Sequence, residues 1–159
     1  MFGRGKTSGV LKWSLIGSAI AGGIALYSHR TKAVMGERDA ILVTDFVNTT
    51  ADPVFDGTLK KAVAVDLGQS PFLNVFPDQK VRQTLQYMGR SPEDRVTTDV
   101  GREICLRNGI KAMLTGTIAN LGKQYVITLE AVNATGESLA REQVEANSKE
   151  EVLNALHKA

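Results

Sequence analysis

The hydrophobic pattern of the chain changes at about residue 39. Before that point there is one long apolar run, Val10 to Tyr27, and after it apolar residues recur in short runs with the period of a strand or of a helix. An α-helix rises about 1.5 Å per residue, so the run would be about 27 Å long, close to the hydrocarbon thickness of a bilayer. We therefore expect a cytoplasmic stub at residues 1–9, a transmembrane helix at 10–28 and a juxtamembrane linker at 29–38.

Two other interpretations of the apolar run remain open. A cleaved signal peptide also has a basic start, followed by an apolar stretch of about 7–15 residues that ends in a small-residue cleavage site. Gly23 to Ala25 resembles such a site, but the bulky Leu26 and Tyr27 follow it, which favours retention. The third interpretation is a helix buried within protein. An uncleaved anchor accounts best for the length of the run.

Basic residues flank the run on both sides and define its orientation only weakly. Arg4, Lys6 and Lys12 come before its core, and Arg30, Lys32 and Arg38 follow it. Positive charge favours the cytoplasmic side, so the two flanks nearly cancel. The short stub is the part more easily kept in the cytoplasm. We therefore expect a single-pass protein of the inner (cytoplasmic) membrane whose carboxy-terminal domain is periplasmic or otherwise extracytoplasmic.

Residues 39–159 begin with a predicted strand–helix–strand unit. Ala40 to Val47 and Phe72 to Phe76 are runs rich in β-forming residues. Between them, Asp52 and Pro53 indicate a helix start, with a capping side chain before a proline at the first helical position. The apolar face of this helix is Phe55, Leu59, Val63 and Leu67. Such a unit favours parallel pairing of its two strands.

Further helices and strands are predicted after residue 76. Helix starts are expected at Pro77 and at Ser91 to Asp94, and Asn108 with Gly109 ends the later helix. A last helix is expected to begin with a capping box formed by Ser148 and Glu151. Three strand-length runs lie between these helices, at residues 112–119, 125–132 and 139–146. The short turns between these runs favour an antiparallel meander.

These elements predict an α/β fold for residues 39–159, with helices packed on a mixed β-sheet in the order β-α-β-α-α-β-β-β-α, preceded by one transmembrane helix. About 120 residues suffice for one continuous core, so a second domain is not expected. The 159 residues carry a formal net charge of only +2. No basic stripe interleaved with aromatic residues is present, so nucleic acid is not an expected partner.

The sequence offers few groups for catalysis or metal binding. His29 and His157 are the only histidines, in the linker and at the carboxyl end, and neither is expected to activate Cys105 or a serine. Cys105, the only cysteine, is expected to be a buried small apolar residue. Asp45, Asp52 and Asp56 could ligate a metal ion, but a structural role explains them better. We expect no catalytic residue, no cofactor and no metal site.

Two candidate contact surfaces remain. Small residues recur every four positions in the apolar run, which would let another helix approach closely. These residues are Ser14, Ser18 and Gly22 on one stripe and Gly17, Ala21 and Ala25 on a second. In the domain, Asn48, Thr49 and Thr50 follow the first strand and are polar residues that a partner could contact. Their other interpretation is a turn specified by local chemistry.

Five segments carry a resemblance to a known family: Asp45–Leu59, Gln69–Leu73, Thr84–Arg90, Gly116–Ile118 and Ser148–Leu153. Together they resemble the extracytoplasmic segment of membrane-anchored serine/threonine kinases and winged-helix regulators common in acidobacteria. The likeness implies a fold similar to the amino-terminal domain of the Tol-system propeller protein, which acts through protein contact. The family also implies a kinase or DNA-binding domain before the membrane helix and tetratricopeptide repeats after the segment, and this sequence contains neither.

The expected function is that of a non-enzymatic, single-pass, membrane-anchored envelope module acting through protein–protein contact, as a sensor, a scaffold or an accessory subunit of a membrane complex. Its expected partners are membrane lipid and other membrane or envelope proteins, with a homo-oligomer or a place in a larger complex as further possibilities. The alternative is a small membrane-tethered enzyme or ligand-binding receptor domain, which polar residues converging in a concave pocket would support.

Overall fold

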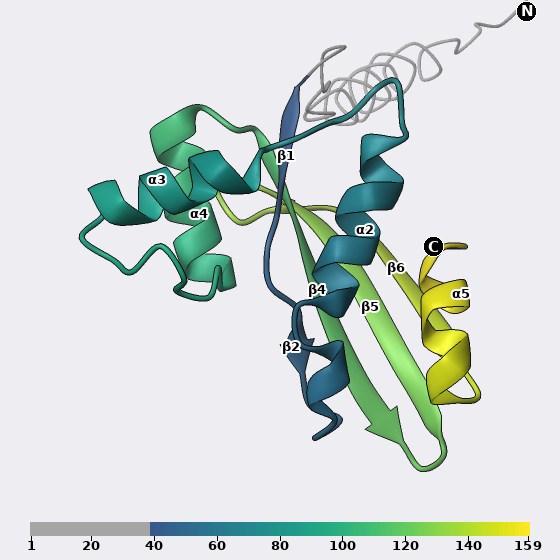
Figure 1. The fold of residues 1–159 in the computed structure, drawn as a ribbon. Helices are drawn as coiled ribbons and strands as arrows, with labels where there is room; N and C mark the ends of the chain where they lie inside the picture. The colour runs from purple at the N-terminus through teal and green to yellow at the C-terminus, as the bar shows by residue number, and fades with distance from the viewer. Residues whose placement is uncertain (1–38) are drawn as a thin grey trace, which may run out of the picture. The chain divides into compact units, whose positions relative to one another are not determined.

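A computed structural model describes residues 39–159, which lie within one compact unit (Figure 1). The strands are β1 (Ala40–Val43), β2 (Val47–Asn48), β3 (Asn74–Val75), β4 (Ala112–Leu121), β5 (Gln124–Asn133) and β6 (Ser138–Ala146). The α-helices are α2 (Thr58–Gly68), α3 (Asp78–Tyr87), α4 (Thr98–Asn108) and α5 (Val152–Leu156). Short 3-10 helices, η1 (Pro53–Phe55) and η2 (Lys149–Glu151), precede α2 and α5. This order confirms the α/β fold predicted for the domain.

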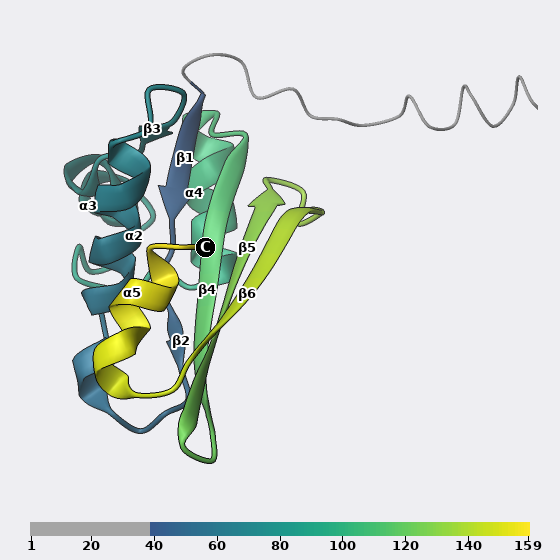
Figure 2. The same cartoon turned by 90° about the vertical axis from the view of Figure 1, so that its right-hand side faces the viewer.

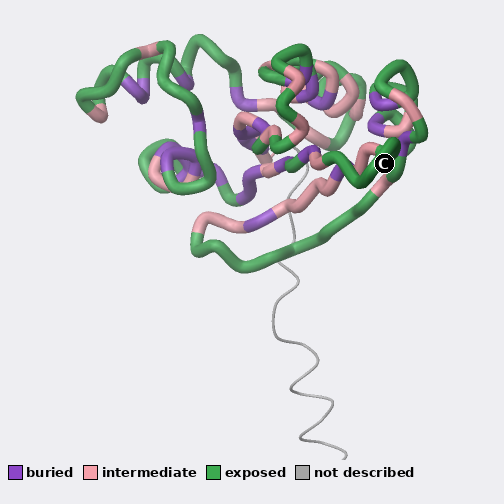
Figure 3. The backbone as a smooth tube through the Cα atoms, turned by 90° about the horizontal axis from the view of Figure 1, so that it is seen from below, coloured by how far each residue is buried: buried purple, intermediate pink, exposed green. Residues whose placement is uncertain are grey.

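The six strands form one mixed sheet in the order β3-β1-β4-β5-β6, with β2 also paired to β4. Strand β1 is parallel to both of its neighbours, with Ile41 opposite Val75 on β3 and Ala112 on β4. The pairs β4–β5 and β5–β6 are antiparallel, which confirms the predicted meander. The outer strand β6 is exposed along most of its length (Figure 3).

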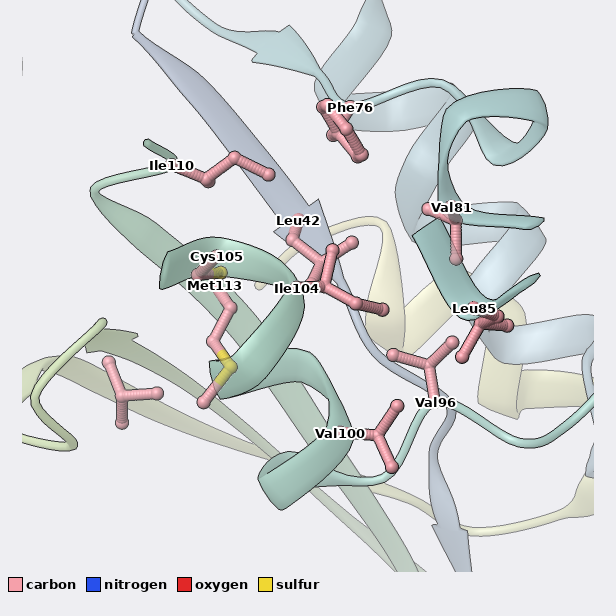
Figure 4. Packing of buried hydrophobic residues seen from close by; sticks show 11 residues of the cluster. Leu42, Phe76, Val81, Leu85, Val96, Val100, Ile104, Cys105, Ile110 and Met113 are labelled. Atoms are coloured by element: carbon pink, nitrogen blue, oxygen red, sulfur yellow. The ribbon is translucent and has the colours of Figure 1, made fainter. Parts of the chain in front are cut away.

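Helices cover both faces of the sheet and create two separate core clusters. Helices α2 and α5 lie on the same side of the sheet (Figure 2), over a cluster that includes Val43, Leu59 and Ile118. Helices α3 and α4 enclose the other cluster, in which Leu42 and Ile104 lie close together (Figure 4). Consecutive residues of β1 point to opposite faces, as pleating requires, so Leu42 and Val43 belong to different clusters.

Two details of the strand–helix–strand unit differ from the prediction. The first strand is divided, because the chain leaves the sheet between Val43 and Val47 before pairing again with β4 as β2. Asp52 is a cap, as predicted, since its Oδ1 accepts a hydrogen bond from Val54 N at 3.0 Å. It caps η1, however, and α2 begins only after Gly57, whose φ of 75° is left-handed. A residue with that φ cannot continue a right-handed helix, so the 3-10 turn and α2 remain separate.

The helix start predicted at Ser91–Asp94 is wrong. That segment is a turn, and α4 begins later, with the Thr97 side chain accepting a hydrogen bond from Val100 N. The predicted end of α4 is confirmed by Gly109, which has a φ of 66°.

The capping box predicted at Ser148 is also wrong in its details. The Ser148 side chain caps no backbone N–H, and the Glu151 carboxylate accepts instead from Asn147 N at 3.2 Å. The Glu150 backbone amide lowers the pKa of the Glu150 carboxyl, and a hydrogen bond from the Ser148 hydroxyl lowers it further. The helix that follows is short: η2 leads into the five residues of α5.

The predicted transmembrane helix at residues 10–28 lies outside the described residues, as do the stub and the linker. Among residues 39–159, no helix combines the length and the apolar character needed to span a bilayer.

Candidate functional site

The six small residues predicted as contact stripes in the apolar run also lie outside the described residues, so their role stays a prediction. They are Ser14, Ser18, Gly22, Gly17, Ala21 and Ala25.

The polar turn at Asn48–Thr50 satisfies its own hydrogen bonds. The Asn48 Oδ1 atom accepts from Thr50 N at 3.0 Å and from Thr50 Oγ1 at 2.7 Å, while Asn48 Nδ2 donates to Asp52 O at 2.8 Å. The Thr49 hydroxyl donates to the carbonyl of Ile118 on β4 at 3.1 Å. These contacts favour the structural interpretation of the turn, and its role as a partner surface stays a prediction.

Two of the three carboxylates considered as metal ligands have partners of their own. Asp52 accepts a hydrogen bond from the Lys149 ammonium, and this bond, followed by the one from Val54 N, lowers the pKa of Asp52. Asp56 Oδ1 accepts from Asn48 Nδ2 at 3.1 Å. Within residues 39–159, no group of three or more His, Cys, Asp or Glu side chains is arranged to hold a metal ion.

The third carboxylate, Asp45, joins two segments that are far apart in sequence. Its Oδ2 accepts from Val96 N at 2.6 Å, and Asp45 N donates to Val96 O at 2.9 Å. Its Oδ1 lies 3.2 Å from the Lys60 ammonium on α2. Next to this pair, Arg95 Nη2 donates to Phe46 O at 2.8 Å. Asp45 therefore attaches both α2 and the segment before α4 to the end of β1.

Cys105 and His157 lie on opposite sides of the sheet. Cys105 is fully buried on α4, in the cluster beneath α3 and α4. His157 follows α5 at the surface, where its Nδ1 is 2.9 Å from Asp66 Oδ2 on α2. The histidine is therefore not placed to activate the thiol, and burial raises the pKa of Cys105 to about 11.

We expect iodoacetamide to label Cys105 in the native protein at least about 100-fold more slowly than in the urea-unfolded chain at the same pH. The thiolate is the reactive form, and in the native protein Cys105 is fully buried and has a raised pKa. Mass spectrometry of timed samples would measure both rates. Comparable rates in the two states would show that the α3–α4 side of the core opens readily.

A crevice of about 600 Å³ lies at the carboxyl ends of β1 and β3, where α2 and α3 diverge. Helix α2 follows β1 over one face of the sheet, and α3 follows β3 toward the cluster on the other face. In open α/β sheets, the position where successive connections leave in opposite directions is where ligands bind. The volume is within the range of small-molecule sites.

The crevice has an apolar floor and a charged rim. The apolar lining includes Val43, Val75, Val81 and Leu85. The charged lining consists of Lys60 and Lys61 from α2, Asp78 and Arg82 from α3, Asp45 after β1, and Glu93 and Asp94 from the segment before α4. Three cations and four anions thus surround an apolar base.

Of the rim residues, only Asp45 was considered from the sequence, as a possible metal ligand for which a structural role was the better explanation. A usable sequence pattern was nevertheless present, because a carboxylate directly after the first strand of a parallel strand–helix–strand unit lies at the carboxyl edge of the sheet. Lys61, Arg82 and Glu93 carry no local pattern that points to a site. Only the fold brings them together.

No protein-family model matches the sequence, and no curated protein matches it either. Solved structures do match. The C-terminal domain of LpoB from Salmonella enterica has a TM-score of 0.64 at 15% identity, over 79% of this chain and 94% of that chain. Lipoprotein GNA1162 from Neisseria meningitidis has a TM-score of 0.57 at 20% identity, over 76% of this chain and 91% of that chain.

A third similar structure is PelC from Paraburkholderia phytofirmans, solved as a dodecamer, with a TM-score of 0.52 at 12% identity over 77% of this chain and 87% of that chain. At these identities the likeness establishes a shared fold. It supports a fold shared with the LpoB C-terminal domain and with lipoprotein GNA1162, and it gives no support to a relationship with kinases or winged-helix regulators. The specific likeness to the Tol-system propeller protein stays a prediction.

Proposed function

We propose that the protein is a non-enzymatic envelope module that is anchored in the inner membrane by residues 10–28 and acts through contact with other membrane or envelope proteins. The observation that carries the proposal is the fold of residues 39–159, which is shared over 94% of the LpoB C-terminal domain and over 91% of a neisserial lipoprotein. The proposed arrangement places this domain outside the cytoplasm and the short stub inside.

The chemistry of the domain supports a contact role. Among residues 39–159, the one histidine, His157, lies at the surface on the other side of the sheet from the buried thiol of Cys105. The carboxylates of Asp45 and Asp52 hold turns in place. A module of this kind would work as a sensor, a scaffold or an accessory subunit, and it would bind its partner through the membrane helix, the domain surface near Thr49, or both.

The small-residue stripes supply the test of this proposal. We expect the double variant Ser18→Leu with Gly22→Leu to lose most of the proteins that co-purify with the full chain in a mild detergent, because close helix approach depends on small side chains. A quantitative pull-down from native membranes would measure the loss, and a second, differently tagged copy would show whether the partner is another copy of this chain.

The matched control is Ala19→Leu with Gly23→Leu, which adds similar bulk and hydrophobicity to a different face of the same predicted helix. This control should retain the co-purifying proteins. Equal recovery with both double variants would contradict a contact through the stripes, and the absence of any specific co-purifying protein from the parent chain would contradict the contact role itself.

A further inference from the structure

The crevice between α2 and α3 has charged side chains without partners on each of its walls. Lys60 is engaged by Asp45. In the part of the chain that the structure describes, the side chains of Lys61, Asp78, Arg82 and Glu93 have no hydrogen-bond or ion-pair partner. They come from three different segments, and each borders the same apolar floor. All four side chains are exposed to solvent around this floor, so a molecule bound in the crevice would meet them directly.

The balance of charge limits what that molecule can be. Three cations and four anions line the crevice, so its formal charge is close to zero. A polyphosphate would meet too many carboxylates, and a divalent cation would meet too many ammonium and guanidinium groups. A molecule with one positive and one negative group satisfies both kinds of rim residue. The floor, which includes Val43, Val75 and Leu85, suits a short apolar body between those groups.

The structure also indicates where each group would bind. Lys61 and Arg82 face the crevice from α2 and α3 and can both bind a carboxylate. Helix α3 starts at Asp78 after Pro77, and the Asp78 carboxylate in its first turn already balances the positive end of the helix dipole, so Lys61 and Arg82 supply the attraction. Glu93, on the segment before α4, supplies the main acceptor for an ammonium group, and Asp94, whose Oδ2 lies 4.0 Å from Arg90 Nη1, supplies a second.

We propose that this crevice binds an amino acid or a short peptide through both its free carboxylate and its free ammonium group. Lys61 and Arg82 hold the carboxylate, Glu93 and Asp94 hold the ammonium, and the apolar floor holds the side chain. This ligand site is separate from the protein-contact role proposed above, and it gives the module a means of sensing small molecules outside the cytoplasm.

The test uses the full chain, labelled with nitrogen-15, in detergent micelles, and the dipeptide L-alanyl-L-leucine as the probe. We expect saturable shifts of the amide resonances of Lys61, Asp78 and Glu93. N-acetyl-alanyl-leucine lacks the ammonium and alanyl-leucine amide lacks the carboxylate, and we expect each to bind about tenfold more weakly. No saturable shift of these resonances up to about 10 mM probe would overturn the proposal, since weaker binding falls outside a specific site.

Two double variants locate the carboxylate contact. In Lys61→Gln with Arg82→Gln, the dipeptide should bind about tenfold more weakly, and the variant should no longer distinguish the dipeptide from its amide. The control, Lys123→Gln with Lys158→Gln, removes two exposed lysines that do not line the crevice and should bind as the parent does. Unchanged resonances outside the crevice would show that each variant is folded.

Two further results would overturn the proposal. The first is equal affinity for the dipeptide and both blocked analogues, which would make the crevice a groove for the middle of a peptide. The second is unaltered dipeptide binding in the Lys61→Gln and Arg82→Gln variant. Neither result bears on the pull-down described above, so this proposal and the contact role can fail separately.

Discussion

A Gly116→Ala variant is expected to lose about 2–3 kcal/mol of unfolding free energy, although alanine normally suits a strand better than glycine by about 0.5–1 kcal/mol. A Cβ atom at residue 116 would lie only 2.3–2.6 Å from three ring carbons of Phe46. That ring is 2% exposed within the cluster beneath α2 and α5, so it has little room to move away. Urea denaturation of the variant and the parent would measure the difference.

The matched control is Gly68→Ala at the end of α2, where a Cβ would meet nothing within 4 Å. This change should be neutral or stabilise by up to about 1 kcal/mol, because alanine restricts the unfolded chain. If a clash with the Phe46 ring causes this loss of stability, then Phe46→Leu should lower the free energy of unfolding less in the Gly116→Ala variant than in the parent, by at least about 1 kcal/mol. Additive losses, or a Gly116→Ala variant as stable as the parent, would contradict this explanation.

The contact between Gly116 and Phe46 shows why the order of elements could be predicted from sequence and the packing could not. Periodicity and caps are local: Leu59 and Val63 are buried on α2 as their spacing predicts, and Gly109 ends α4 where it was expected. The Phe46–Gly116 contact joins residues that are 70 positions apart, and no local pattern signals it.

The same distinction explains the errors near Ser91 and Val43. Ser91–Asp94 has the composition of a helix start, but in the fold this segment leads the chain to Asp45. There, Val96 N donates to Asp45 Oδ2 and Asp45 N donates to Val96 O. The sequence around Thr44 continues the β-rich run, but β1 ends at Val43, and the Thr44 hydroxyl donates to the Leu114 carbonyl at 3.2 Å. Tertiary contacts override local propensity at both places.

The crevice was not predicted from the sequence, although a local pattern at Asp45 could have pointed to its location. The parallel unit placed the carboxylate of Asp45 at an edge of the sheet where ligands bind. Lys61, Arg82 and Glu93 belong to three segments whose convergence depends on how α2, α3 and the turn before α4 pack. The surface charges of helices have no distinguishing pattern of their own, so these residues could be recognised only in the folded domain.

An Asp45→Ala variant is expected to lose about 2–3 kcal/mol of unfolding free energy, because a hydrogen bond to a charged acceptor is removed and the donor is left without a partner. The donor is the backbone N–H of Val96, a residue only 2% exposed, and Lys60 loses its ion pair at the same time. Asp45→Asn keeps an acceptor for Val96 N and should lose only about 1 kcal/mol. Urea denaturation would rank the two variants against the parent.

Trypsin provides a second measurement of the same contact, since Arg90 and Arg95 lie in the segment that Asp45 attaches to the sheet. Release of this segment in Asp45→Ala should speed cleavage after both arginines well before the domain unfolds globally, because local opening then requires less free energy. Asp56→Ala is the matched control, because the exposed Asp56 carboxylate accepts a hydrogen bond only from the Asn48 amide among the described residues. This change should alter the free energy of unfolding by less than about 0.5 kcal/mol. If Asp45→Ala resists trypsin as the parent does, the Asp45 side chain is not what holds this wall of the crevice in place. The backbone hydrogen bond from Asp45 N to Val96 O would then be enough to hold the segment on the sheet.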